Sequence, residues 1–529
     1  MRDFYLKRAE ENLPPFFYET VTSDNNVEIV ADENAFLGFS ARPVGKIPDV
    51  LKKGDRFVVD FGRHCVGRVS FTLWDNGRYI DAPVRVKMRF AEVPYELGRD
   101  HASYHGGLCE SWLMEDIFNF DLIGRIELPR RYSFRYMEVT VVSTPRPTRL
   151  YDFSVKCETT ADVSKLIPLP DGTDEELVAI DRVAAATLRD CMQSSYEDGP
   201  KRDRRLWSGD LRLQALTDHV LFGNDMLARR CLYLFAAAVR EGKYLPGCIY
   251  QYPDFSFDNG MEIPDYSMLW CASVNDYYEK TGDLDTVREL FPVVKNEIGI
   301  AIDTLDENGI VTLPEGGWPG FIDWAPGLER LTAVHGAYLY ALERVVPLAR
   351  ALGEDALAVR WEKALAEGRA KAMEQLFDSE AGAFINTYEK AQKPVEGAFV
   401  PKAAERKPDS KGQLSVQSQV WMVLGGVITG EAGKHALLYA LESADSIKPV
   451  TPYMHHYLVE AMLLLGMKDE ALAHLKSYWG AMVRYGADTF WEVFVDHSPE
   501  ISAYNDPLIH SFCHAWSCSP SYFIRKYFI

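Results

Sequence analysis

The chain has 529 residues, 47% of them apolar and 25% charged, which is enough for two to four domains and a large buried core. A formal net charge of −20 argues against nucleic acid and anionic membranes as partners and suits an enzyme that acts on neutral substrates. The nine cysteines include no CxxC pair, and the charged N-terminus contains no apolar signal segment. We therefore expect reduced thiols and a cytoplasmic protein.

The first third of the chain has the alternating pattern of half-buried β-strands. In "PVRVKMRFAE", residues 83–92, apolar side chains alternate with basic ones. Further candidate strands are "RFVVDFG" (56–62), "GRVSFTLWD" (67–75) and "RYMEVTVVS" (135–143), with turn residues between them. This pattern predicts an N-terminal β-sandwich domain over residues 1–160.

The periodicity becomes helical near residue 170. The segment "DGTDEELVAIDRVAAATLRDCM", residues 171–192, opens with a predicted capping box of Thr173 and Glu176 and continues with apolar residues at helical spacing. About a dozen amphipathic segments of this kind follow, many joined by short turns. Because no repeat of fixed period is visible, we favour a closed (α/α)6 toroid over an α-solenoid. We predict a linker at 161–175 and the toroid at 176–529, so the protein is mainly α with an N-terminal β-sandwich.

One stretch at the start of the helical part carries an unusual density of charge around a tryptophan. The sequence "YEDGPKRDRRLWSGDLRLQ", residues 196–214, places Glu197, Asp198, Asp203 and Asp210 among basic residues. Its Gly-Pro pair imposes a turn, so the carboxylates need not point apart. Arginines hold some carboxylates ionised, whereas a desolvated carboxyl stays protonated, and a site that needs both an acid and a base is built in this way.

Three other stretches between helices are rich in aromatic and acidic residues. They are "LPGCIYQYPDFSFDNGMEIPDY" (245–266), "LPEGGWPGFIDWAP" (313–326) and "DTFWEVFVDHSPE" (488–500). Ordinary turns do not carry this density of Trp, Tyr, Phe and Asp. We expect these stretches to line one pocket together with the charged stretch, and we interpret residues 389–413 as an exposed, mobile loop.

These motifs and their order resemble glycoside hydrolase family 78, the α-L-rhamnosidases. "DGPKRDRRLWSGD" is similar to the acidic, arginine-rich segment of that family, "DTFWE" to the segment with its second catalytic carboxylate, and "SFCHAWSCSPSYF" to the following His-containing helix. Weaker matches are "IPDYSMLW", "YYEKTGD" and "FIDWAP", and, among the strands, "VVDFGRHCVGRV", "RFAE" and "RRYSFRYMEV". The resemblance covers most of the chain, from about Val58 to Phe523.

The resemblance implies an inverting hydrolase that uses no metal. It assigns the general acid to Asp203 and the general base to Glu492, and it implies that Asp198 and Asp210 bind the sugar hydroxyls. The remaining candidates for substrate binding are Arg202, Trp207, Asp265, Asp323, Trp324 and His514.

Each assignment has a structural alternative. Many family members have Glu where this chain has Asp203, so Glu197 is a rival acid, and Asp203 itself is also explained by a salt bridge to its neighbouring arginines. Glu492 is also explained as a buried carboxylate at a helix start. Turn, cap or core roles are the alternatives for Asp198, Asp210, Trp207, Trp324, His514 and Asp265.

Our leading hypothesis is an exo-acting inverting α-L-rhamnosidase, or a hydrolase of a closely related α-L-sugar, with a small-molecule glycoside or oligosaccharide as substrate. Its pocket should combine acids for the ring hydroxyls with an apolar patch for the methyl group of rhamnose. The alternatives are a sugar epimerase or polysaccharide lyase on the same toroid, and a non-catalytic carbohydrate-binding protein. HExxH, paired CxxC and GxSxG motifs are missing from the sequence, so we predict neither metal nor cofactor. A homo-oligomer stays an open alternative to a monomer.

Overall fold

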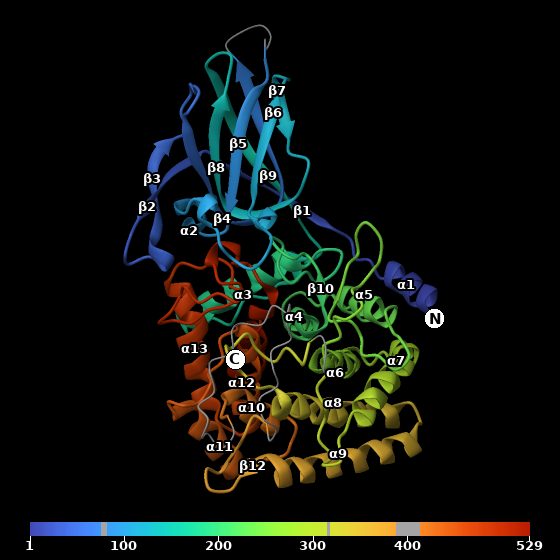
Figure 1. The fold of residues 1–529 in the computed structure, drawn as a ribbon. Coiled ribbons are helices and arrows are strands. Elements are labelled where there is room, and N and C mark those ends of the chain that lie inside the picture. Colours follow the sequence, from blue (N-terminus) through green and yellow to red (C-terminus); the bar gives the residue numbers. More distant parts are fainter. Residues whose placement is uncertain (76–81, 315–317, 388–412) are drawn as a thin grey trace.

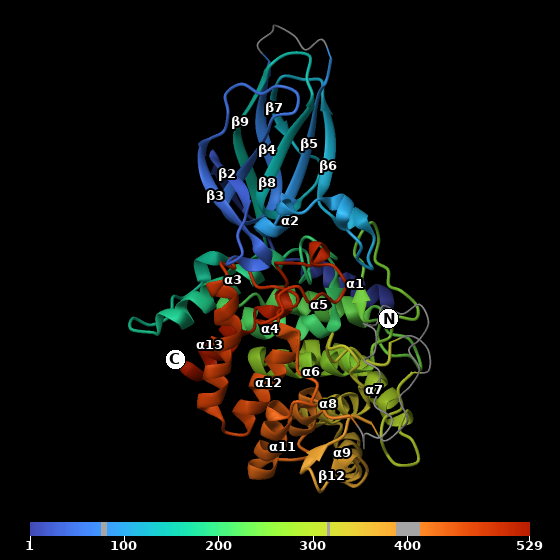
Figure 2. The same ribbon diagram turned by 60° about the vertical axis from the view of Figure 1, so that its left-hand side comes forward.

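The chain folds into a strand domain stacked on a larger helical domain (Figures 1 and 2). The computed structural model describes four stretches of the chain, residues 1–75, 82–314, 318–387 and 413–529. The predicted loop at 389–413 lies outside them except for its last residue. The predicted fold class, an antiparallel β domain followed by a mainly helical one, is confirmed.

Nine antiparallel strands occur in the described part of the β domain, with β1, β9, β4, β8, β5 and β6 in that order and β2, β3 and β7 pairing beside them. The strands are β1 (Phe17–Ser23), β2 (Asn25–Ala31), β3 (Phe39–Lys46), β4 (Arg56–Asp75), β5 (Val84–Ala91), β6 (Glu115–Phe120), β7 (Gly124–Glu127), β8 (Tyr132–Ser143) and β9 (Thr148–Thr159).

Strand β4 changes its pairing partner along its length. We predicted two strands here, but the chain continues as one strand with an irregular register between Asp60 and Cys65. The first part of β4 pairs with β8 and the second part with β9, and Gly67 faces both neighbours. A Cβ at Gly67 would lie 2.2 Å from the carbonyl oxygen of Lys156, so only glycine fits where the strand changes partner.

The alternating pattern of β5 is confirmed, with one exception. Val84, Val86, Met88 and Phe90 point into a core that also receives apolar side chains from β4, β8 and β9. Arg89, which the pattern assigns to solvent, is buried because its guanidinium donates hydrogen bonds to backbone carbonyls beyond β5, at 2.7 Å to residue 96 and 2.6 Å to residue 99.

Twelve α-helices follow the strand domain in the described stretches. They are α3 (Glu175–Cys191), α4 (Ser208–Leu221), α5 (Asp225–Ala236), α6 (Pro264–Thr281), α7 (Leu284–Asp303), α8 (Leu331–Ala351), α9 (Asp355–Leu376), α10 (Val416–Leu424), α11 (Gly430–Glu442), α12 (Pro452–Leu464), α13 (Lys468–Arg484) and α14 (Pro520–Phe523). The predicted capping box of α3 is wrong in detail, since the N-cap is Asp174, whose side chain accepts from the backbone N–H groups of the first turn.

The even-numbered helices α4, α6, α8, α10 and α12 form the inner part of a ring, each in contact with the next. The odd-numbered helices pack outside them. The ring closes where α3, the first helix of the ring, contacts α13 and α14, and where α14 also contacts α4. A salt bridge stabilises this closure, since Arg525 Nη2, just after α14, lies 2.7 Å from Asp181 Oδ2 in α3. A solenoid would leave its first and last helices apart, so the contacts at the ring closure support the predicted toroid.

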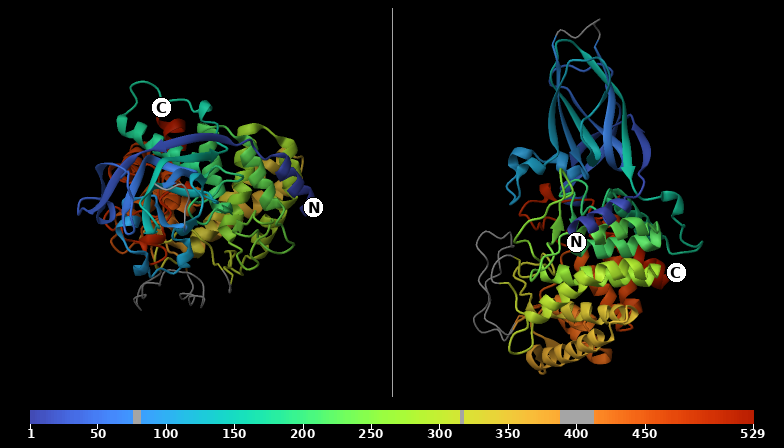
Figure 3. Two further views of the ribbon diagram at one scale, coloured as in Figure 1. Left: turned by 90° about the horizontal axis from the view of Figure 1, so that it is seen from above. Right: turned by 90° about the vertical axis from the view of Figure 1, so that its right-hand side faces the viewer.

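The first helix, α1 (Arg2–Glu11), lies against the helical domain although it precedes the strands (Figure 3). Tyr5 and Ala9 are buried against α5, and the Tyr5 hydroxyl donates a hydrogen bond of 3.0 Å to the carbonyl of Glu289 in α7. The chain therefore touches its helical domain before it enters the strands. None of the helices in the described stretches is long and apolar enough to cross a membrane.

Candidate active site

A cavity of about 190 Å³ opens near the N-terminal ends of α4 and α6. The charged stretch and all three aromatic stretches that we expected to share one pocket contribute to it, and the strand domain adds Leu108. Its lining residues are Leu108, Asp198, Arg202, Asp203, Arg205, Trp207, Asp210, Met261, Ile263, Tyr266, Trp318, Phe321, Trp324, Glu492, Tyr504, His514 and Trp516.

The loop before α4 is folded around the carboxylate of Asp198. Its Oδ1 accepts a hydrogen bond of 3.0 Å from the N–H of Arg205, and its Oδ2 one of 3.3 Å from the N–H of Asp203. Burial, followed by the nearby charge of Asp203, raises the pKa of Asp198 to about 7. Asp198 thus orders the turn, as its structural alternative stated, and also lines the cavity.

Arg202 connects the two predicted catalytic carboxylates. Its buried guanidinium forms an ion pair with Glu492 through Nη2 and a hydrogen bond of 3.2 Å to Asp203 Oδ1 through Nη1. Its Nε donates a hydrogen bond of 3.0 Å to the carbonyl of Ile509. Arg205 approaches Asp203 from the other side, with Nη1 at 3.6 Å from Oδ2. Segments almost 300 residues apart therefore meet at one guanidinium.

Glu492 is almost fully buried and has a hydrogen-bond donor at each oxygen. The Tyr504 hydroxyl donates to Oε1 at 2.7 Å, and the N–H of Ser511 donates to Oε2 at 3.2 Å. The N–H of Glu492 in turn donates to the Ser511 carbonyl at 3.0 Å. These contacts give the carboxylate one fixed orientation at the cavity wall.

Asp210 and His514 face the cavity as an unsatisfied pair. Asp210 Oδ1 lies 3.9 Å from His514 Nδ1, and neither atom has a hydrogen-bond partner within the described stretches. Burial, followed by the charge of Asp198, raises the pKa of Asp210 well above its ordinary value. Burial, followed by the charge of Arg202, lowers the pKa of His514 well below its ordinary value. A carboxyl that keeps its proton and a neutral imidazole offer a donor and an acceptor to a polar ligand.

Aromatic rings form much of the remaining wall. Trp207 and Trp324 are half-buried and line the cavity, and the indole N–H of each lacks a partner in the described part of the chain. Trp324 lies 5.8 Å from Trp318 and 5.9 Å from Tyr504, measured between ring centroids. Buried polar groups normally have partners, so these free N–H groups suit a ligand that supplies acceptors.

Two predicted contact residues lie outside the cavity lining and have a different role. Asp265 accepts from the N–H groups of Phe321 and Ile322 at 2.8 and 3.0 Å and is fully buried. Asp323 is also fully buried and accepts at Oδ1 from Trp324 N and the Thr451 hydroxyl, at 2.9 and 2.7 Å. Both carboxylates already accept hydrogen bonds from protein donors and lie outside the cavity lining. We therefore revise their predicted role from contact with the sugar to support of the aromatic wall.

Glu197, the rival acid, also lies outside the lining. Both of its oxygens accept from Arg131 Nη2 of the strand domain at 2.7 Å, so it is a buried ion-pair partner between the domains. The structure in turn brings Tyr504, Tyr266, Leu108 and Arg205 to the cavity, which the sequence did not single out. Tyr504 and Leu108 sit in segments without a motif or a helical period, so no local signal marked them.

The cavity therefore holds the carboxylates of Asp203 and Glu492 on segments far apart in the chain, together with Asp198, the pair of Asp210 and His514, and aromatic walls. This is the inventory that cleavage of a glycosidic bond needs. One group of potential metal ligands occurs in the described stretches, His64, Asp190 and Cys513, with ligand atoms within 4.8 Å of one another. Both ring nitrogens of His64 already have hydrogen-bond partners there, at 2.7 Å to Asp190 and 3.0 Å to Ser133, so we do not assign this group to a metal.

Comparison with protein families agrees with this chemistry over nearly the whole chain. Residues 172–528 match the bacterial α-L-rhamnosidase six-hairpin glycosidase domain. Residues 23–159 match the N-terminal domain of the glycosyl hydrolase family 78 α-rhamnosidases. The fold and the site thus define a six-hairpin glycosidase. More specifically, the chain belongs to glycoside hydrolase family 78.

Solved structures show the same likeness. A rhamnosidase from Klebsiella oxytoca with rhamnose bound is 35% identical, with a TM-score of 0.91, and the match covers 100% of this chain and 99% of that one. The family 78 rhamnosidase of Bacillus sp. GL1 shares the fold at 23% identity and a TM-score of 0.74, over 93% of this chain and 50% of that one. No curated protein matches the sequence.

Proposed function

We propose that the protein removes terminal α-L-rhamnose from glycosides, with inversion at the anomeric carbon. The observation that carries this proposal is that Arg202 joins Asp203 and Glu492 across one small cavity. The similarity over the full length to a rhamnosidase that holds rhamnose supports the choice of sugar.

In the proposed reaction, Asp203 is the general acid and Glu492 the general base. Glu492 takes a proton from a water molecule, whose oxygen forms the new bond to the anomeric carbon. The bond from that carbon to the leaving oxygen breaks, and Asp203 supplies the proton that this oxygen needs. Water and leaving group occupy opposite faces of the sugar, so the configuration inverts.

The spacing of the two carboxylates is compatible with inversion. An inverting pair is about 6.5–9.5 Å apart to leave room for water, whereas a covalent route uses about 5–5.5 Å. The guanidinium of Arg202 lies between the carboxylates and binds one with each terminal nitrogen, which allows up to about 8 Å between the nearest oxygens. This upper limit admits both spacings, so the choice of the route with a water molecule between Glu492 and the sugar rests on the resemblance of the motifs to the inverting family 78.

The cavity also supports exo action on a deoxy sugar. Its volume of about 190 Å³ suits a single sugar ring rather than a chain. Its inner lining combines Asp210 and His514, which can bind ring hydroxyls, with the buried rings of Tyr266, Phe321 and Trp516, against which a methyl group can pack. Leu108, Trp318 and Trp324 are only half-buried and form the mouth, where the leaving group extends.

Proton NMR during the first minutes of hydrolysis tests the proposal. An α-L-rhamnoside should release β-L-rhamnose first, and the α-anomer should then grow by mutarotation. Initial accumulation of the α-anomer would show retention and remove Glu492 from the role of base. Release of no sugar from any α-L-rhamnoside, by protein that binds L-rhamnose, would instead support the non-catalytic alternative.

A further inference from the structure

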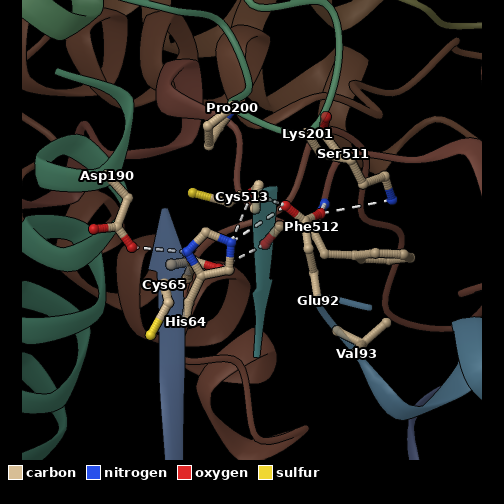
Figure 4. Close-up of polar contacts among 12 residues, drawn as sticks. His64, Cys65, Glu92, Val93, Asp190, Pro200, Lys201, Ser511, Phe512 and Cys513 are labelled. Atoms are coloured by element: carbon tan, nitrogen blue, oxygen red, sulfur yellow. Dashed lines mark hydrogen bonds and ion pairs between the residues drawn. The ribbon is translucent and has the colours of Figure 1, made fainter. Parts of the chain in front are cut away.

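Two motifs of the strand domain meet at the interface between the domains, away from the sugar cavity. His64 comes from "VVDFGRHCVGRV" on β4, and Glu92 ends "RFAE" directly after β5. Both side chains are buried, and Figure 4 shows His64 between Asp190 of α3 and Glu92. Neither residue has a role in the proposed reaction, so their burial at this interface needs a separate explanation.

Glu92 contacts strand domain and helical domain at the same time. On the strand side, its Oε1 accepts from the Ser133 hydroxyl at 2.7 Å and lies 3.2 Å from His64 Nε2. On the helical side, its Oε2 accepts from the N–H of Phe512 at 2.6 Å and lies 3.6 Å from Lys201 Nζ (Figure 4). A buried carboxylate with this many donors is held in place by all of them.

The contact with Lys201 reaches the loop of the general acid. Lys201 directly precedes Arg202, and its ammonium group forms ion pairs with Glu92 and Glu96 at 3.6 and 2.7 Å. Glu96 belongs to the short helix α2 (Pro94–Gly98) and accepts through Oε2 from the N–H of Glu92 at 2.6 Å. Within the described stretches, the two carboxylates that pair with this buried ammonium group both belong to the strand domain. The ammonium group also donates a hydrogen bond to the His510 carbonyl of the base segment.

The contact with Phe512 reaches the general base. Phe512 follows Ser511, whose N–H donates to Glu492 Oε2 at 3.2 Å and whose hydroxyl donates to the Arg202 carbonyl at 2.8 Å. Residues 509–512 thus lie between the acid loop and the base. The carboxylate of Glu92 accepts a hydrogen bond from Phe512, which follows Ser511, and it pairs with Lys201, which precedes Arg202.

We propose that Glu92 is a positioning residue that anchors the acid loop and the base segment to the strand domain and so fixes the placement of Asp203 relative to Glu492. The inference rests on the catalytic roles proposed above. Its physical basis is that one buried carboxylate contacts both segments, while Asp210 on α4 and Trp324 of the sugar wall belong to other segments. Loss of the anchor should therefore disturb the chemical step more than sugar binding, because a displacement of about 1 Å is enough to slow a reaction about 10²-fold.

The test compares Glu92→Gln with Glu138→Gln in the full chain. Glu138 is a matched control, since it is a buried carboxylate of the same domain whose partners are the strand-domain residues Arg89 and Arg56, at 3.5 and 3.8 Å. With an alkyl α-L-rhamnoside as substrate, whose leaving group needs protonation, we expect Glu92→Gln to lower kcat about 10²-fold. We expect the Kd for L-rhamnose to stay within about threefold of the wild-type value, and Glu138→Gln to leave kcat within about threefold.

Hydrogen exchange gives a second reading that does not depend on activity. Backbone amides of residues 198–205 and 509–512 should exchange at least about tenfold faster in Glu92→Gln than in Glu138→Gln. If wild-type protein hydrolyses no rhamnoside, the proposed function fails. The exchange rates still test whether Glu92 holds the two segments in place. If Glu92→Gln does not fold, Ser133→Ala, which removes one donor to Glu92, should show both effects to a smaller degree.

Three results would overturn the inference. One is equal kcat values for the two Gln variants, and another is a rise in KM without a fall in kcat. The third is unchanged exchange in both segments of Glu92→Gln, which would show that they hold their places without the strand-domain carboxylate.

Discussion

Single carboxylates in the cavity are held in different ways, and this difference predicts how their variants behave. Glu492 accepts from Tyr504 and the Ser511 N–H and pairs with Arg202. Glu492→Gln keeps the size of the side chain and an acceptor oxygen but cannot take a proton from water. We expect kcat to fall by about 10²–10⁴-fold while the thermal unfolding midpoint changes little. Steady-state kinetics and circular dichroism check this, and a variant with near-normal kcat would exclude Glu492 as the base.

Asp203 is the less buried of the pair and is the proposed proton donor. Asp203→Asn removes the proton but keeps an acceptor for Arg202, whose Nη1 lies 3.2 Å from Oδ1. A rhamnoside with an alkyl leaving group needs protonation, so its kcat/KM should fall by about 10²–10⁴-fold. A nitrophenyl rhamnoside needs little protonation and should lose much less. Equal losses on both substrates would place Asp203 in sugar binding.

Asp198 predicts a pH dependence of stability. Its pKa rises from 3.8 to about 7 on folding, mainly through burial, so the folded state binds its proton more tightly than the unfolded state. Asp198 therefore contributes to the free energy of unfolding at low pH, and this contribution is lost as the pH rises from about 4 to 7. Asp198→Asn does not titrate, and its amide oxygen can accept one of the two backbone N–H bonds that Asp198 accepts.

We therefore expect the free energy of unfolding of Asp198→Asn to lie about 1–3 kcal/mol below that of wild type at pH 4, because one backbone N–H loses its acceptor. By pH 8, the variant should gain about 2–4 kcal/mol relative to wild type. Urea unfolding across this pH range measures the difference. A variant that is destabilised by the same amount at every pH would mean that Asp198 is ionised throughout in the folded protein.

At the scale of elements, the strand domain reaches into the cavity through the loop between β5 and β6. The Tyr104 hydroxyl donates to the Leu108 carbonyl at 2.9 Å, and the N–H of Gly107 donates to the Tyr504 carbonyl at 2.8 Å. These bonds place Leu108 at the mouth beside Trp324. The loop therefore touches the leaving group in the proposed reaction, while the sugar lies deeper.

Leu108→Ala should weaken binding of an aromatic leaving group more than binding of the sugar. Loss of about 1 kcal/mol of apolar contact should raise KM for an aryl α-L-rhamnoside about fivefold, and the Kd for free L-rhamnose should stay nearly constant. Leu122→Ala, at a strand-domain leucine that is 74% exposed, is the control. An equal rise in both constants would place Leu108 against the sugar itself.

At the scale of the whole molecule, the ring depends on contacts between its first and last helices. Arg525 and Asp181 form a two-point ion pair, with Nε to Oδ1 at 2.9 Å and Nη2 to Oδ2 at 2.7 Å. Arg525→Met would leave Asp181 buried without its partner, which costs about 3–5 kcal/mol. We expect a lower denaturation midpoint, and partial recovery in the double variant with Asp181→Leu. A stability equal to wild type in Arg525→Met would mean that α3 and the helical segment Ile524–Phe528 after α14 hold together without this pair.

Much of the fold follows from local sequence patterns. The alternation in β5 and the helical period after residue 170 mark the two domains, because each pattern records which side of one element faces a core. The site was predicted through motifs in the same way. Asp203, Asp210 and Glu492 lie in short segments with distinctive composition, and the structure places all three at one cavity.

What the sequence alone determined about this protein is therefore local: the periods of its strands and helices, its turns, and the short acidic and aromatic motifs. Only the tertiary structure decided which carboxylates face the cavity and which, such as Asp265 and Asp323, are consumed by backbone donors behind its wall. It also decided that Glu92 meets Phe512 across 420 residues of chain. Such contacts depend on how whole domains pack. A local sequence pattern around either partner does not indicate which distant residue it will meet.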